Sequence, residues 1–76
     1  MKLSNQQRRI VKYCKEFDGI TSWEAMRNLG VMRLEARIFE LKSMGFEIAD
    51  RWIDDINRYG EKVRYKRYII LREAND

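Results

Sequence analysis

The 76-residue chain contains no histidine, no proline and one cysteine, Cys14. Without histidine, a zinc site built from Cys and His cannot form within one chain, and the commonest general base is missing. A single cysteine excludes an intrachain disulfide, and its helical spacing from Ile10 and Phe17 predicts a small buried hydrophobe. Neither a paired-carboxylate pocket nor a glycine-rich phosphate loop is visible. The sequence therefore argues against an enzyme, a metal, a cofactor or a small-molecule substrate.

Long apolar runs and linker-like segments are also missing. No stretch approaches the roughly 18 apolar residues that a membrane span needs, and residues 1–17 lack an apolar segment of signal-peptide type. The absence of proline and the low glycine content leave no visible linker. We therefore expect one cytoplasmic domain over residues 1–76 with no membrane partner. A domain of this size buries only about 60% of its unfolded surface, so its stability should be modest.

Two short helices with a glycine between them are the central feature of residues 20–45. Thr21 and Glu24 have the spacing of a capping box, and Gly30 is placed as a left-handed helix end. The next apolar residues recur at i, i+4 and i+7, and they are Leu34, Ile38 and Leu41. This pattern predicts helices over about 22–29 and 33–44, joined as in a helix-turn-helix.

A third helix precedes this pair, over about residues 4–17. Ser4 and Gln7 form a second capping-box pattern, and Asp18 with Gly19 ends the helix. Its surface is basic, a pattern typical of a solvated face and less often of phosphate contact.

The apolar spacing changes to that of strands after Gly45, and it predicts a hairpin over about residues 46–71. Its tip is the turn Asn57–Gly60, with Asn first and Gly fourth. Val63 and Tyr65 are expected to point inward, and a bulge near Arg67 would transfer that role to Tyr68 and Ile70. We expect two tryptophans in the core, Trp23 and Trp52. Phe39 points away from the Leu34 stripe, and we expect it to pack under the hairpin, the alternative being an exposed aromatic at a partner surface.

Three helices followed by a two-stranded hairpin define an α+β, mainly α, winged helix-turn-helix fold. The stretches LGVMRLEARIFELKSMGFEI and NRYGEKVRYKRYIIL resemble a family of small helix-turn-helix proteins found mostly in bacteriophages and prophages. The matching residues are Leu29, Gly30, Met32, Arg33, Leu34, Arg37, Ile38, Asn57, Arg58, Tyr59 and Gly60. Glu35 and Tyr65 depart from the family pattern, since small and aliphatic residues are common there. The resemblance implies a DNA-binding fold and a bacterial host cell.

Charge is unevenly spread along the chain. The stretch Arg58–Arg72 has six basic residues and one acid, a net charge of +5, whereas residues 40–57 carry a net charge of −3 from two basic residues and five acids. A basic wing beside a reading helix would gain affinity for DNA by releasing condensed counterions.

These observations predict a double-stranded DNA-binding protein, such as a transcriptional regulator or a recombination accessory factor. The helix over 33–44 would read the major groove, and Arg33 and Glu35 are suited to guanine and cytosine. Arg58 would enter the minor groove. The full set of candidate contacts is Arg33, Glu35, Ala36, Arg37, Arg58, Tyr59, Lys62, Arg64 and Lys66.

Other interpretations of the same residues stay open. Charges on a hairpin also give solubility and block edge-to-edge pairing, and Arg37 could pair with Glu40. Winged helices also bind proteins, and an acidic cluster in the first strand favours that alternative: Asp50, Asp54 and Asp55. A homodimer is a further alternative, because one reading helix covers only a few base pairs.

Overall fold

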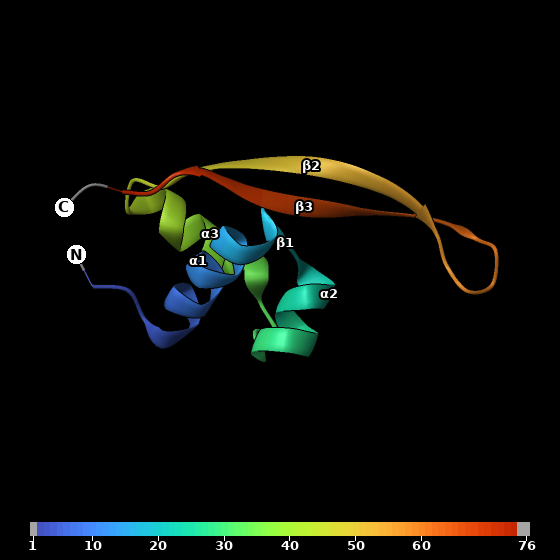
Figure 1. Ribbon diagram of the computed structural model, residues 1–76, viewed down its shortest axis with the longest axis horizontal. Helices are drawn as coiled ribbons and strands as arrows, with labels where there is room; N and C mark the ends of the chain where they lie inside the picture. The colour runs from blue at the N-terminus through green and yellow to red at the C-terminus, as the bar shows by residue number, and fades with distance from the viewer. Residues whose placement is uncertain (1, 75–76) are drawn as a thin grey trace.

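The computed structural model describes residues 2–74. The elements are α1 (Asn5–Phe17), β1 (Ile20–Thr21), α2 (Ser22–Glu24), the π-helical turn η1 (Ala25–Leu29), α3 (Leu34–Ser43), β2 (Glu47–Ile56) and β3 (Lys62–Arg72). The helices lie together on one side of the sheet, and the β2–β3 hairpin projects beyond them (Figure 1). The predicted α+β fold, with three helices and an antiparallel wing, is confirmed. Within residues 2–74, no helix is long and apolar enough to cross a membrane.

Both predicted capping boxes are present. Gln7 N donates to Ser4 Oγ at 3.2 Å, and the Gln7 side chain accepts from Ser4 N at 2.9 Å. Thr21 and Glu24 make the equivalent pair of hydrogen bonds at 3.2 and 2.9 Å. Each box satisfies two amides that the first turn of a helix leaves without partners.

The turn of the helix-turn-helix begins where α2 widens into η1. Gly30 has a φ of 68°, a left-handed conformation that glycine adopts without steric penalty. The amides of Gly30 and Val31 both donate to the Ala25 carbonyl. The glycine therefore ends the second helix as the sequence indicated, and it directs the chain into α3.

The hydrophobic core joins all three helices to the inner part of the sheet. Its buried members are Ile10, Val11, Cys14, Ile20, Ala25, Val31, Leu34, Ile38, Leu41, Phe46 and Tyr68. The predicted stripe of α3 and the predicted burial of Cys14 are confirmed. Burial also raises the pKa of the Cys14 thiol to about 11.

The sheet has a third strand that the sequence did not predict. β1 is only two residues long and pairs with β3, which gives the strand order β1-β3-β2. Gly19 leads into it with a φ of 138°, and a Cβ there would lie 2.8 Å from the Tyr68 carbonyl oxygen. Arg67 closes this region, because it donates to the Phe17 carbonyl at 2.6 Å and contacts Glu24 at 3.4 Å.

The register of the hairpin corrects one prediction. Arg67 pairs regularly with Arg51, so the expected bulge is not there. The irregularity lies at the base of the hairpin, between Glu47 and Ile48. No bulge near Arg67 is needed, because the outer hairpin extends beyond the core and has no inward side to maintain.

The predicted packing of three aromatic residues was wrong, and for Phe39 the alternative of an exposed side chain holds. Trp23, Trp52 and Phe39 have exposed fractions of 60%, 53% and 71%. The two tryptophans lie on elements whose outer surfaces the small core does not reach. Phe39 lies on the solvent side of α3, opposite the stripe that faces the core.

Candidate nucleic-acid interface

The first turn of α3 presents three of the predicted contacts. Arg33 occupies the N-cap position without a side-chain cap, and it is exposed. Glu35 is also exposed, whereas Ala36 is half-buried. Burial raises the pKa of Tyr68, and the negative charge of Glu35 raises it further. Glu35 is therefore close enough to the hairpin to act on it electrostatically.

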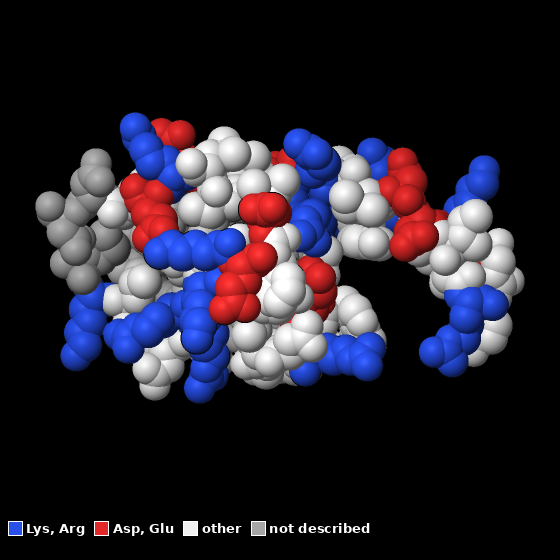
Figure 2. All heavy atoms as spheres, viewed as in Figure 1, with Lys and Arg blue, Asp and Glu red and all other residues white. Residues whose placement is uncertain are grey.

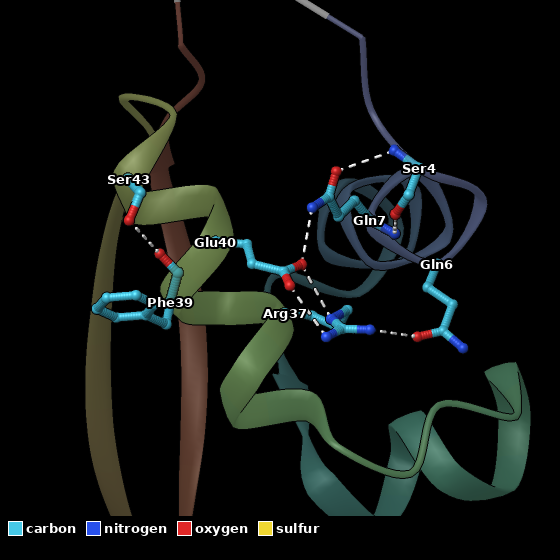
Figure 3. A network of polar contacts seen from close by, with 7 residues as sticks. All are labelled: Ser4, Gln6, Gln7, Arg37, Phe39, Glu40 and Ser43. Atoms are coloured by element: carbon cyan, nitrogen blue, oxygen red, sulfur yellow. Dashed lines mark hydrogen bonds and ion pairs between the residues drawn. The ribbon is translucent and has the colours of Figure 1, made fainter.

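Arg37 belongs to a network that joins α1 to α3 (Figure 3). Its Nη2 donates to Glu40 Oε2 at 3.0 Å, and its Nη1 donates to Gln6 Oε1 at 3.2 Å. Gln7, which caps α1, donates from its Nε2 to Glu40 Oε1 at 2.8 Å. The predicted Arg37–Glu40 pair is therefore present, extended by two glutamines of α1.

This network limits what Arg37 can do at a DNA surface. Its Nε lies 3.0 Å from Glu40 Oε1, close enough for an ion pair but not aligned for a hydrogen bond. Turning the guanidinium outward would leave Glu40 and Gln6 without their partner. The Arg37 side chain is 28% exposed and makes hydrogen bonds to residues of both α1 and α3, so the geometry favours a positioning role for Arg37.

The wing tip is a tight turn that Asn57 organises. The Asn57 side-chain oxygen accepts from the amides of Tyr59 and Glu61 at 2.9 and 3.0 Å. Gly60 N donates to the Asn57 carbonyl at 3.0 Å, and Gly60 has a φ of 78°. The turn holds Arg58 and Tyr59 outward at the end of the hairpin, where Tyr59 is 79% exposed.

Along the rest of the hairpin, acidic β2 neutralises basic β3. Ion pairs join Arg64 to Asp54 at 3.5 Å and Lys66 to Asp50 at 3.2 Å. The hydrogen bond between the latter pair lowers the pKa of Asp50 and raises that of Lys66. A third pair joins Arg72 and Glu47 at the base of the wing at 2.6 Å.

The Trp52 ring lies close to the two central cations of the wing, Arg64 and Lys66. Arg64 Cζ is 4.7 Å and Lys66 Nζ is 5.1 Å from the centroid of the Trp52 ring. Both separations fall within the range of cation–π attraction. Arg64 and Lys66 are therefore each held by a carboxylate and by an aromatic face.

The structure does not bring all predicted contacts together. Arg33, Glu35 and Ala36 lie on α3, close to the helical end, whereas Arg58, Tyr59 and Lys62 lie at the projecting end of the hairpin (Figure 1). Figure 2 shows basic side chains at the wing tip and mixed charges along the hairpin. Within residues 2–74, Arg58 and Lys62 make no ion pair, unlike Arg64 and Lys66.

Two features of this surface were missed, and both have a signal in the sequence. Phe39 lies away from the Leu34–Leu41 stripe on a helical wheel, which indicates exposure. The position of Trp52 follows from the turn, because pairing Ile56 with Lys62 and stepping back along both strands places Trp52 opposite Lys66. The tip residues Asn57 and Gly60 fix that register.

Three helices, the last two joined at a glycine, and a projecting β-hairpin define a winged helix-turn-helix protein. The chain belongs to the family described as the winged helix-turn-helix domain, which matches residues 5–73. Domains of this family generally bind DNA and are typically non-catalytic. Neither the curated proteins nor the solved structures contain a match to the chain.

Proposed function

We propose that the chain is a single domain over residues 1–76 that binds double-stranded DNA, as a phage-type transcriptional regulator or a recombination accessory factor. Its place of action would be the cytoplasm of a bacterial host cell. The observation that carries the proposal is the wing tip, where Arg58 and Lys62 stand at the end of a rigid turn without an ion pair inside residues 2–74. Such cations gain free energy by meeting phosphates.

The contacts divide between the two ends of the molecule. α3 would lie in the major groove, with Arg33 donating to guanine and Glu35 accepting from cytosine. Arg58 and Tyr59 would enter the adjacent minor groove. Lys62 would meet phosphate directly, and two further cations would first exchange a carboxylate for a phosphate oxygen: Arg64 and Lys66.

A homodimer would extend the contact, because one reading helix covers only a few base pairs. Cytoplasmic regulators that bind such short sites usually need a second subunit or a neighbouring protein for useful specificity.

Fluorescence anisotropy with random-sequence duplex DNA at two salt concentrations tests this function. Each phosphate contact contributes roughly −0.9 to the slope of log affinity against log salt concentration. With Lys62, Arg64 and Lys66 at phosphates, we expect a slope of roughly −3. No binding at low salt would refute the proposal.

Point variants test whether the wing contacts the DNA. Arg58→Glu should weaken binding to all duplexes about equally, and Arg33→Ala should relax sequence preference. Lys15→Glu is the charge-matched control, because Lys15 lies on α1 and already pairs with Glu73 at 2.9 Å. If Arg58→Glu and the parent bind equally well at low salt, the wing is not a DNA contact.

A protein-binding function is the second candidate, and one observation favours it. A groove of about 750 Å³ lies between α2 and the wing, and its lining includes apolar side chains that are not buried: Trp23, Ile56, Val63 and Tyr65. The acidic cluster no longer supports this alternative, since Asp50 and Asp54 are paired within the wing. A pull-down with nuclease treatment separates the candidates, because partners retained after digestion favour protein binding.

A further inference from the structure

The solvent side of α3 has one exposed acid in its first turn, Glu35, and an apolar centre. At its centre, Phe39 is 71% exposed, and Ala36 lies one turn before it. Ser43 lies one turn after Phe39, but its hydroxyl donates to the Phe39 carbonyl at 3.0 Å (Figure 3). The centre of this face therefore offers a methyl group, a phenyl ring and a hydroxyl whose hydrogen is already used.

The polar residues at one side of this face are already engaged. Arg37 and Glu40 bond to each other and to the glutamines of α1. Exposed cations lie at the two ends of the helix, Arg33 before the first turn and Lys42 in the last. They are roughly 14 Å apart along the helix axis, which is comparable with the major-groove width of about 12 Å. At one end Lys42 can therefore meet a phosphate and at the other Arg33 can reach a guanine, while the apolar centre faces the bases.

The major groove offers one apolar group for such a face, the C5-methyl group of thymine. We propose that α3 selects thymine through Phe39, whose ring contacts the methyl group while Ala36 leaves room for the base edge. This inference rests on the proposed function and specifies how the reading helix discriminates. It makes Phe39 a specificity-determining residue.

The test compares thymine with uracil, which lacks only the methyl group. Duplexes are first selected from a random library by the parent protein, and the enriched pool is then amplified with either dTTP or dUTP. Burying one methyl-sized group is worth about fourfold in a binding constant. We therefore expect the uracil pool to bind about fourfold more weakly for each methyl group contacted.

Two variants show whether Phe39 is responsible for the difference. Phe39→Ala should bind both pools equally and should retain the salt dependence of the parent. Phe17→Ala removes a comparably exposed phenylalanine from α1 and should keep the preference for thymine.

The outcomes separate this inference from the proposed function. Equal binding of both pools by the parent overturns thymine reading but leaves DNA binding intact. A preference for thymine that survives in Phe39→Ala shows that the methyl group acts through another residue or through DNA shape, and it also overturns the inference. No binding to any duplex at low salt overturns both.

Discussion

The helical body and the outer hairpin are stabilised by different interactions. The body, residues 2–50 and 67–74, contains every residue of the buried core. The outer hairpin, residues 51–66, contains no buried residue. It is ordered by strand pairing, the Asn57 turn and cross-strand pairs of charge. Stability therefore belongs mainly to the body, and the hairpin can change its surface chemistry at little cost in folding free energy.

The largest expected difference between the two regions comes from removing an apolar side chain. Leu41 is fully buried in α3, so Leu41→Ala should reduce the free energy of unfolding by about 2–5 kcal/mol. Ile56→Ala, at a mostly exposed position of the hairpin, should change it by less than about 1 kcal/mol. Urea denaturation followed by circular dichroism measures both free energies of unfolding. Equal losses in the two variants would contradict the conclusion that stability belongs mainly to the body.

The next prediction concerns the Cys14 thiol, which the core should protect from alkylation. Because burial raises its pKa to about 11, the folded thiol has roughly a hundredfold less thiolate at pH 8 than an ordinary cysteine. Alkylation by iodoacetamide should be slow in the native protein and fast in urea. Rapid alkylation of the native protein would show that the core opens readily.

The same pKa shift predicts a loss of stability in alkaline solution. The thiol ionises near pH 9 in the unfolded chain and near pH 11 in the folded one, so thiolate formation favours unfolding as the pH rises from about 9 to 11. Cys14→Val should lose less stability over this range than the parent. Thermal melts at a series of pH values would detect the difference. If the parent and Cys14→Val lose stability in parallel, the alkaline loss belongs to other ionisable groups.

A smaller effect on the free energy of unfolding is expected at the start of α2, in the helical body. Thr21→Ala removes the hydroxyl that caps α2 and should reduce the free energy of unfolding by about 1 kcal/mol. Thr21→Ser keeps the hydroxyl and should retain most of the stability. If both variants are equally destabilised, packing of the threonine methyl group, and not the cap, is what matters at this position.

The smallest effect on stability belongs to the wing. Asp54→Asn breaks an exposed pair with Arg64, so it should change the free energy of unfolding by less than about 1 kcal/mol. It should also release Arg64 toward phosphate and raise duplex affinity at low salt by a few-fold. Asp18→Asn, at the end of α1, is a charge-matched control that should leave duplex affinity unchanged. Unchanged affinity of Asp54→Asn would show that Arg64 does not contribute.

Local features of the fold could be predicted because they depend on residues close together in the chain. The capping boxes at Ser4 and Thr21, the left-handed Gly30 and the Asn57 turn each follow from a few neighbouring residues. Strand β1 could not be predicted in this way, because two residues carry no periodicity. Strand β1 forms because Gly19 brings the chain beside Tyr68 of β3.

The candidate interface was only partly predictable for the same reason. The sequence identified the basic residues of the wing, but a count of charges cannot show which of them already have partners. The register places Asp54 opposite Arg64, and it brings Asp50 to within 3.2 Å of Lys66. Of the four predicted wing cations, Arg58 and Lys62 are left without an ion pair within residues 2–74. Exposure of Phe39, by contrast, follows from its place on the helical wheel, away from the Leu34–Leu41 stripe.

The sequence by itself determined where helices begin and end and where the hairpin turns, because capping and turn geometry act over three or four residues. Tertiary structure alone decided that Trp23 and Trp52 reach solvent and which charges are neutralised. Those outcomes depend on the position of a small core and on cross-strand register, which bring together residues far apart in the chain. The body follows from local patterns of apolar residues, whereas the surface of the wing follows from pairing between its strands.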